Sequence, residues 1–144
     1  MAGWISYKDE SMAFNNRQFS SSISLVVEVA EKMANENEKA FVERVKDEMV
    51  TNYYPGLCID IEKDFPEIEE RKFWAIMFYE TAREIFDRNI GIHDYSFWQT
   101  QRIYQIYGTG DLFVKAVKEV ESSWFPDTRD ISEFNDWVKR RSGE

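Results

Sequence analysis

The stretch that decides the fold runs from Phe65 to Gly108 and reads FPEIEERKFWAIMFYETAREIFDRNIGIHDYSFWQTQRIYQIYG. It contains nearly half of the aromatic residues of the chain. In its first half, apolar side chains recur at spacings of three and four residues, which is the pattern of one buried helix face. The second half carries a broad apolar stripe, and the polar break over residues 89–94 is short. We therefore predict two long antiparallel helices that form a central hairpin.

Capping residues indicate where these two helices begin and end. Asp64 is a candidate N-cap of the first helix, and Pro66 suits its first turn. Gly91 can supply the left-handed cap at its C-terminus. The second helix is expected over residues 94–108, with the glycines of 108–110 as its stop.

Helical periodicity also appears outside the central hairpin. Further helices are predicted over residues 23–35, 37–53, 112–120 and 131–138, with Asp111 and Asp130 as N-caps of the last two. Residues 57–61 alternate enough for a short extended piece, but too briefly to imply a sheet.

The N-terminal segment is the least regular part of the pattern. Residues 1–19 show no clean period, yet they are too apolar for a loose tail, so we expect an arm packed on the helices. The predicted fold class is all-α, with residues 1–144 forming a single domain. Its architecture is expected to be a compact, irregular bundle of five to six helices around the central hairpin.

Composition narrows the class of protein. The chain has 144 residues, of which 43% are hydrophobic and 16% aromatic, enough for a packed core. No apolar run approaches the roughly 20 residues of a membrane helix, and no basic region followed by an apolar block indicates a signal peptide. Cys58 is the only cysteine, which excludes an intramolecular disulfide. A cytoplasmic protein without membrane association is therefore expected.

Charge is concentrated in one third of the chain. The net charge of −9 argues against a nucleic-acid binder, whose affinity depends on neutralising phosphates. Residues 36–70 carry 11 acidic and 4 basic side chains, a net charge of −7. Such a block attracts a basic partner and speeds their encounter. The alternative is an ordinary solvated helix face.

Candidates for catalysis are isolated residues rather than complete motifs. His93 is the only histidine, and its place in the turn suits a surface or capping residue. Glu80 and Glu84 lie four residues apart on one helix face, where Arg83 can pair with them. Cys58 has no histidine or lysine near it in sequence and is expected to be a buried structural thiol.

No complete metal motif is present either. Asp60, Glu62 and Asp64 alternate like the start of a calcium loop, but the EF-hand pattern needs Gly at position 6 and Glu at position 12. Phe65 and Arg71 occupy those positions. Dinuclear carboxylate bundles use Glu-x-x-His pairs, and no glutamate here has a histidine three residues on. We therefore expect no catalytic residue, no metal and no cofactor.

In character, the whole chain resembles the immunity proteins of bacterial toxin systems. The resemblance is carried by an acidic block and the rings beside it: Tyr53, Tyr54, Asp60, Glu62, Asp64, Phe65, Glu67, Glu69 and Glu70. It implies a non-catalytic protein that binds a cognate toxin, for example a nuclease, and occludes its basic active site. The carboxylates would stand in for phosphate, and the rings would supply the desolvated anchors.

Two other classes of function stay open at this stage. A small helical enzyme or ligand-binding domain would place a pocket between the two central helices, with Glu80, Arg83, Glu84 and His93 as its polar groups. A structural or adaptor subunit would dimerise through the aromatic surface. A deep pocket with converging polar side chains would favour the enzyme or ligand-binding domain.

Overall fold

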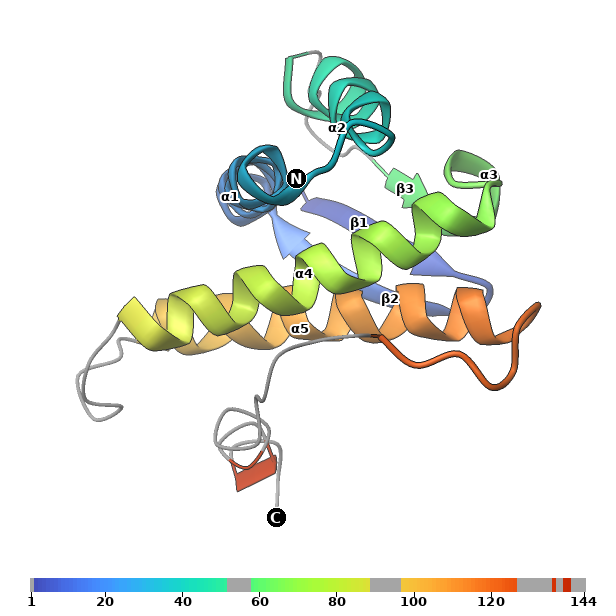
Figure 1. Cartoon of the computed structure of the whole chain (residues 1–144). Helices are drawn as coiled ribbons and strands as arrows, with labels where there is room; N and C mark the ends of the chain where they lie inside the picture. Colours follow the sequence, from blue (N-terminus) through green and yellow to red (C-terminus); the bar gives the residue numbers. More distant parts are fainter. Residues whose placement is uncertain (1, 52–57, 89–96, 127–135, 137–138, 141–144) are drawn as a thin grey trace.

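The computed structural model describes residues 2–51, 58–88, 97–126, 136 and 139–140 (Figure 1). A β-hairpin of β1 (Ala2–Tyr7) and β2 (Glu10–Asn15) precedes helix α1 (Asn16–Met33). Helix α2 (Lys39–Val45) continues into the π-helical turn η1 (Lys46–Thr51). Strand β3 (Cys58–Asp60) leads into the short helix α3 (Ile61–Asp64). The long helices α4 (Ile68–Arg88) and α5 (Phe97–Lys118) follow.

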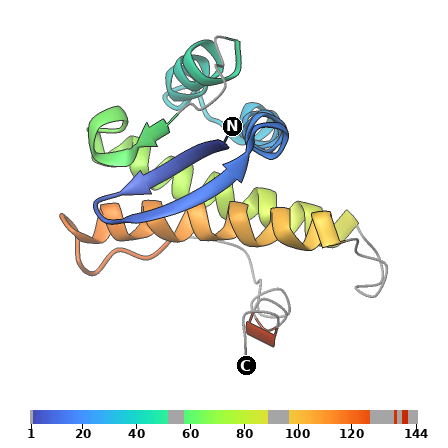
Figure 2. The same cartoon turned by 180° about the vertical axis from the view of Figure 1, so that it is seen from behind.

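The prediction of an all-α bundle is wrong, because the described residues include a three-stranded mixed sheet. The strand order is β2-β1-β3, with β1 antiparallel to β2 and parallel to β3. The protein is therefore an α+β fold, in which the described residues form five α-helices and a small sheet. The strands lie behind α4 in Figure 1 and in front of it in Figure 2, which is seen from the opposite side.

The sheet was missed because the hairpin lacks a strong turn signal. Ile5, Tyr7 and Phe14 point into the core, whereas Trp4 and Ala13 point outward, which is the two-residue period of a half-buried strand. The residues expected to form an N-terminal arm form this hairpin instead, and its strands contact α1 and α5. The turn contains Lys8 at a φ of 56°, where glycine or asparagine is the usual signal.

Strand β3 completes the sheet from a distant part of the sequence. The short extended piece expected over residues 57–61 is confirmed for Cys58–Asp60. Its pairing was not expected: Ile59 lies beside Ile5 in the parallel register with β1. A strand this short is stabilised by its pairing and by burial of its central residue, neither of which is visible in a local pattern.

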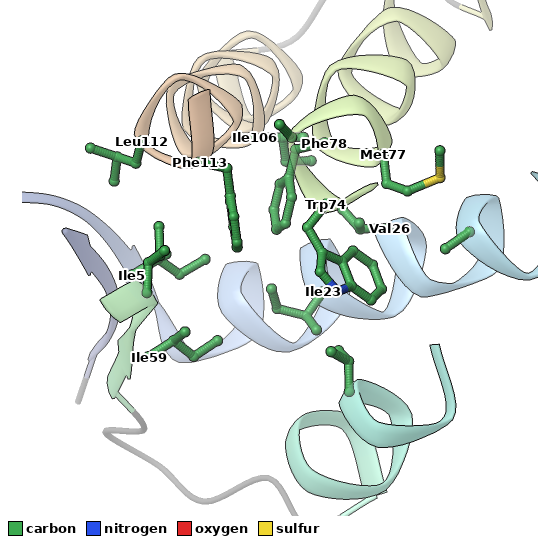
Figure 3. Close-up of a cluster of buried hydrophobic side chains, with 14 of the residues drawn as sticks. Ile5, Ile23, Val26, Ile59, Trp74, Met77, Phe78, Ile106, Leu112 and Phe113 are labelled. Carbon is green, nitrogen blue, oxygen red and sulfur yellow. The ribbon is translucent and has the colours of Figure 1, made fainter. Parts of the chain in front are cut away.

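The central hairpin of helices is confirmed in α4 and α5, which lie antiparallel along each other (Figure 1). Trp74 and Phe78 of α4 are buried, as their spacing predicts. The rings of Phe78 and Phe113 stack with centroids 5.5 Å apart. Figure 3 shows these rings beside Ile5 of the sheet, so the core lies where the hairpin of helices meets the strands.

Helix α5 does not stop at Gly108, as the sequence had suggested, but runs on to Lys118. The two glycines permit close packing instead of ending the helix. A Cβ atom on Gly110 would lie 2.6 Å from Cδ1 of Tyr79 on α4, and one on Gly108 would overlap the terminal methyl group of Met12 on β2. Asp111 consequently lies inside α5 and is not an N-cap.

Other element predictions have mixed outcomes. The helix expected over residues 37–53 is confirmed in α2 and η1 up to Thr51. The helix expected from residue 23 begins earlier, at Asn16. The helix expected over residues 131–138 lies outside the described residues. Among the described helices, none combines the length and apolar character that a bilayer crossing requires.

Gly110→Ala is expected to destabilise the protein by about 1–3 kcal/mol, because the added methyl group overlaps the Tyr79 ring. Without that contact, Gly→Ala inside a helix gains about 1 kcal/mol. Gly108→Ala is the matched control, since the atom it meets is the flexible end of Met12 and can move. Urea unfolding of the three proteins measures the difference, and a Gly110→Ala variant more stable than the wild type would contradict this packing.

Candidate partner-binding surface

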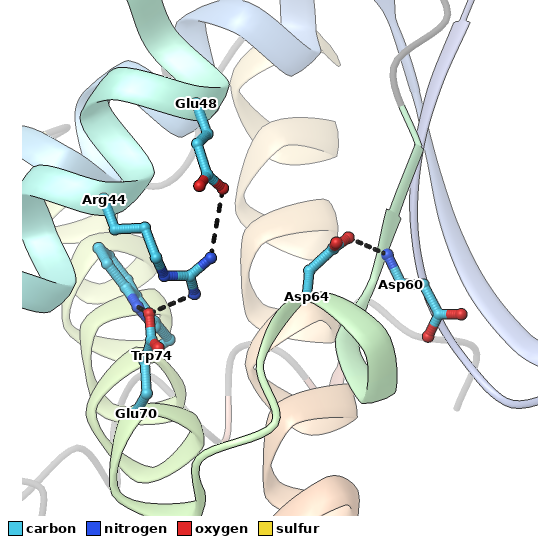
Figure 4. A network of polar contacts seen from close by, with 6 residues as sticks. All are labelled: Arg44, Glu48, Asp60, Asp64, Glu70 and Trp74. Atoms are coloured by element: carbon cyan, nitrogen blue, oxygen red, sulfur yellow. Dashed lines mark hydrogen bonds and ion pairs between the residues drawn. The ribbon is translucent and has the colours of Figure 1, made fainter.

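The acidic block predicted from the sequence lies where β3, α3 and the start of α4 meet (Figure 4). Asp60, Glu62, Glu67 and Glu69 are exposed, and Asp64 is half-buried. Residues that are close in sequence thus form one corner of the molecule, because a short strand, a single helical turn and a new helix follow one another there.

Two of these carboxylates also shape the local backbone. Asp60 is the N-cap of α3, and its Oδ1 accepts a hydrogen bond of 3.0 Å from the Glu62 backbone N–H. Asp64 closes the turn from the other side, since its Oδ2 accepts a bond of 2.9 Å from the Asp60 N–H. Both residues therefore have a structural role, which fixes the position of the exposed acids around them.

Two other residues of the predicted interface are buried. Phe65 is 3% exposed and packs edge-on against Phe113, with ring centroids 5.1 Å apart. Glu70 is 4% exposed, and its Oε2 accepts hydrogen bonds from Arg44 Nη2 at 2.5 Å and from Trp74 Nε1 at 3.3 Å (Figure 4). Phe65 and Glu70 therefore belong to the interior and cannot contact a partner. Tyr53 and Tyr54 lie outside the described residues.

The arginines nearest to the block are directed inward. Arg71 is 8% exposed and donates from Nε to the Phe65 carbonyl oxygen at 2.6 Å and from Nη1 to the Ala116 carbonyl oxygen at 3.0 Å. Arg44 binds the buried Glu70 and lies over the Phe65 ring, 4.8 Å from its centroid. Its second guanidinium nitrogen reaches Glu48 of η1 at 3.3 Å. Neither arginine pairs with the exposed acids of α3.

The lysines leave part of the block unpaired. Lys72 lies 3.3 Å from Glu69 and 2.7 Å from Glu121, which neutralises Glu69 in part. Within the part of the chain that the structure describes, Glu62 and Glu67 have no ion-pair partner. We name Asp60, Glu62 and Glu67 the acidic surface. Lys63 is exposed on the same turn and reduces the local negative charge without pairing with any described residue.

The alternative site around Glu80 is a different feature of the fold. A shallow cleft is lined by Val29, Met33, Glu80, Arg83, Glu84 and Asp87. It lies between α1 and α4, not between α4 and α5 as an enzyme pocket had been expected. Arg83 lies 3.8 Å from Glu80 and 3.5 Å from Asp87, in keeping with an ion-paired helix face. His93 lies outside the described residues.

Cys58 and the carboxylates provide no evident reactive centre among the described residues. Cys58 is exposed on β3, so the expectation of a buried thiol is wrong. The alternation of β3 explains this, because Ile59 takes the inward position and turns its neighbours outward. In the same part of the chain, no three His, Cys, Asp or Glu side chains are grouped closely enough to bind a metal ion.

A partly buried polar pair joins α4 to α5, and no pattern in the sequence indicated it. The Tyr79 hydroxyl donates a hydrogen bond to Asp111 Oδ1, and the ring of Tyr107 lies 4.9 Å from that of Tyr79. Burial raises the pKa of the Asp111 carboxyl group, while the bond from Tyr79 and the charge of Lys115 oppose that rise. Burial also raises the pKa of the Tyr79 hydroxyl, so tyrosine remains the donor.

Comparison with known proteins provides no assignment for this arrangement. No protein-family model, no curated protein and no solved structure matches the chain.

Asp111→Asn is expected to change how stability depends on pH. Because the folded-state pKa of Asp111 is raised, the stabilisation from its protonated form is present at low pH and is lost as pH rises through that pKa. The amide of the substituted side chain keeps an oxygen that can accept from Tyr79, and it does not titrate. The free energy of unfolding of the wild type should therefore fall relative to the variant as pH rises above about 4, the ordinary pKa of an aspartate.

Urea unfolding across this pH range checks the prediction, with Glu62→Gln as a control at an exposed carboxyl group. A wild type that instead gains stability over Asp111→Asn as pH rises would mean that burial does not dominate at this site.

Proposed function

We propose that this chain is a non-catalytic binding protein that neutralises a basic protein partner, in the manner of an immunity protein that inhibits its toxin. The proposal is supported by one observation above the others. Glu62 and Glu67 are exposed and unpaired among the described residues, while Arg44 is bound to the buried Glu70 and Arg71 is held in the interior.

The physical basis of the proposal is that unpaired charges attract a partner over distances longer than a direct contact. Exposed carboxylates act over a Debye length of about 8–10 Å at ordinary ionic strength, which raises the rate of encounter with a cationic surface. Like charges on one corner also repel one another, and a cationic partner relieves that repulsion on binding. The acidic surface thus favours association with a positively charged protein.

The proposed inhibition follows from the role of cationic side chains in the partner's active site. A nuclease binds phosphate groups through lysine and arginine side chains. Carboxylates seated on those side chains compete for the same charge, and the body of the inhibitor excludes the substrate sterically. Asp60, Glu62 and Glu67 are the residues that we assign to this contact, and Tyr53 and Tyr54, which lie outside the described residues, stay aromatic candidates from the sequence alone.

The charge-reversal pair Glu62→Lys and Glu67→Lys should slow association with the partner by roughly tenfold or more and flatten its salt dependence. The partner is obtained by affinity capture from the host at low salt and is identified by rescue of growth when this chain is co-expressed. Stopped-flow or surface-plasmon measurements between about 50 and 300 mM salt, a range over which screening changes strongly, give the rates.

The matched control reverses two exposed acids elsewhere, Glu28 on α1 and Glu36 in the turn before α2, so that the net charge changes equally. Asp60 is left intact because it caps α3. Equal slowing in both double variants would show that only total charge matters, and unchanged rates in the Glu62/Glu67 variant would remove the proposed surface.

A further inference from the structure

The outer face of the sheet is open and has one large side chain at its centre. Trp4 of β1 is 39% exposed and lies between two small neighbours, Ala13 on β2 and Cys58 on β3. Ser6 and Ser11 lie on the same face, while Ile5 and Phe14 point into the core. In Figure 2 the strands lie in front of α4, and none of the described helices crosses this face.

This face borders the acidic surface directly. In the parallel pairing of β1 with β3, Ser6 lies beside Asp60, so Asp60 is the diagonal neighbour of Trp4 on the same side of the sheet. Diagonal neighbours on adjacent strands lie roughly 7–8 Å apart, within reach of aromatic and long side chains. An indole ring and a carboxylate are therefore close enough to contact a single ligand group.

Both groups have capacity left for such a contact. Oδ1 of Asp60 caps α3 at the Glu62 N–H, while Oδ2 has no partner among the described residues. In the same part of the chain, no cation lies over the Trp4 ring. This distinguishes Trp4 from Phe125, the ring of which is covered by Lys118 Nζ at 3.7 Å from the centroid.

We infer that the outer sheet face is the anchoring half of the partner interface, and that it takes an arginine side chain of a basic polypeptide. The guanidinium group stacks on the Trp4 indole and pairs with Asp60 at its edge. Arginine fits better than lysine because its planar cation can stack and donate two hydrogen bonds at once. This inference rests on the proposed function and adds to it the side chain that is recognised and the residue that anchors it.

Binding of a hexa-arginine peptide to the full chain at low salt tests the inference. Trp4→Ala should raise the dissociation constant by about two- to fivefold, as removal of an exposed cation–π contact predicts. Phe125→Ala is the matched control, since it removes an exposed ring outside this face and should leave affinity unchanged. A hexa-lysine peptide should lose less affinity than hexa-arginine, and an equal loss would overturn the assignment to a guanidinium group.

A second variant keeps the test decisive if Trp4→Ala fails to fold. Ala13→Lys places a cation directly across from Trp4 at an exposed position and should also weaken hexa-arginine binding. If neither variant matters while the Glu62/Glu67 reversal weakens binding, this inference is overturned and the proposed function stands. If the peptide does not bind at all, both fail.

The oligomeric state tests whether a second copy of the chain, rather than a basic polypeptide, covers the face. Sedimentation of the wild type and Trp4→Ala should give the same mass for both. A dimer that becomes a monomer on loss of Trp4 would mean that a second copy of the chain covers the face, which would refute the arginine anchor.

Discussion

The structure depends on an ion pair at the start of α4, in which the buried carboxylate of Glu70 binds the half-buried Arg44 of α2. Glu70 is 4% exposed, and an unpaired carboxylate at that depth would cost several kcal/mol. The hydrogen bond from Trp74 holds the same oxygen, so one carboxylate fixes α2 against α4 and orients the largest side chain of the core. Position 70 therefore belongs to the architecture, although the sequence places it within an acidic run.

Arg71, the next residue, has a complementary role. Its guanidinium donates to carbonyl oxygens before α4 and on α5, which fixes α5 beside the turn that contains Phe65. The two neighbouring charges thus connect α4 to α2 and to α5. As a consequence Arg44 and Arg71 are held away from Glu62 and Glu67. The same contacts that stabilise the interior leave the corner at α3 negative, and this corner adjoins the open sheet face with Trp4.

The parts of the fold that follow from a local repeat of apolar residues could be predicted from the sequence. The buried face of α4 was predicted correctly because Trp74 and Phe78 repeat at helical spacing. The hairpin was not, because Lys8 adopts a positive φ without the glycine that usually signals it. Gly110 lies inside α5 and packs closely against Tyr79, a contact far away in sequence that the local pattern does not reveal. For the candidate site, charge counting found the exposed acids but also included Glu70, and Phe65 was added as a neighbouring ring. The burial of both residues depends on distant partners.

The most direct test of this account is a double-mutant cycle of Arg44→Met and Glu70→Gln by urea unfolding. If Arg44 pairs with the buried Glu70 as described, the two substitutions should be strongly non-additive, with a coupling energy of about 1–3 kcal/mol. The double variant should then be more stable than the Arg44→Met single variant, in which Glu70 is left buried and unpaired. Additive effects would mean that Arg44 is free to neutralise the acids of α3, and the negative corner on which the account depends would not exist.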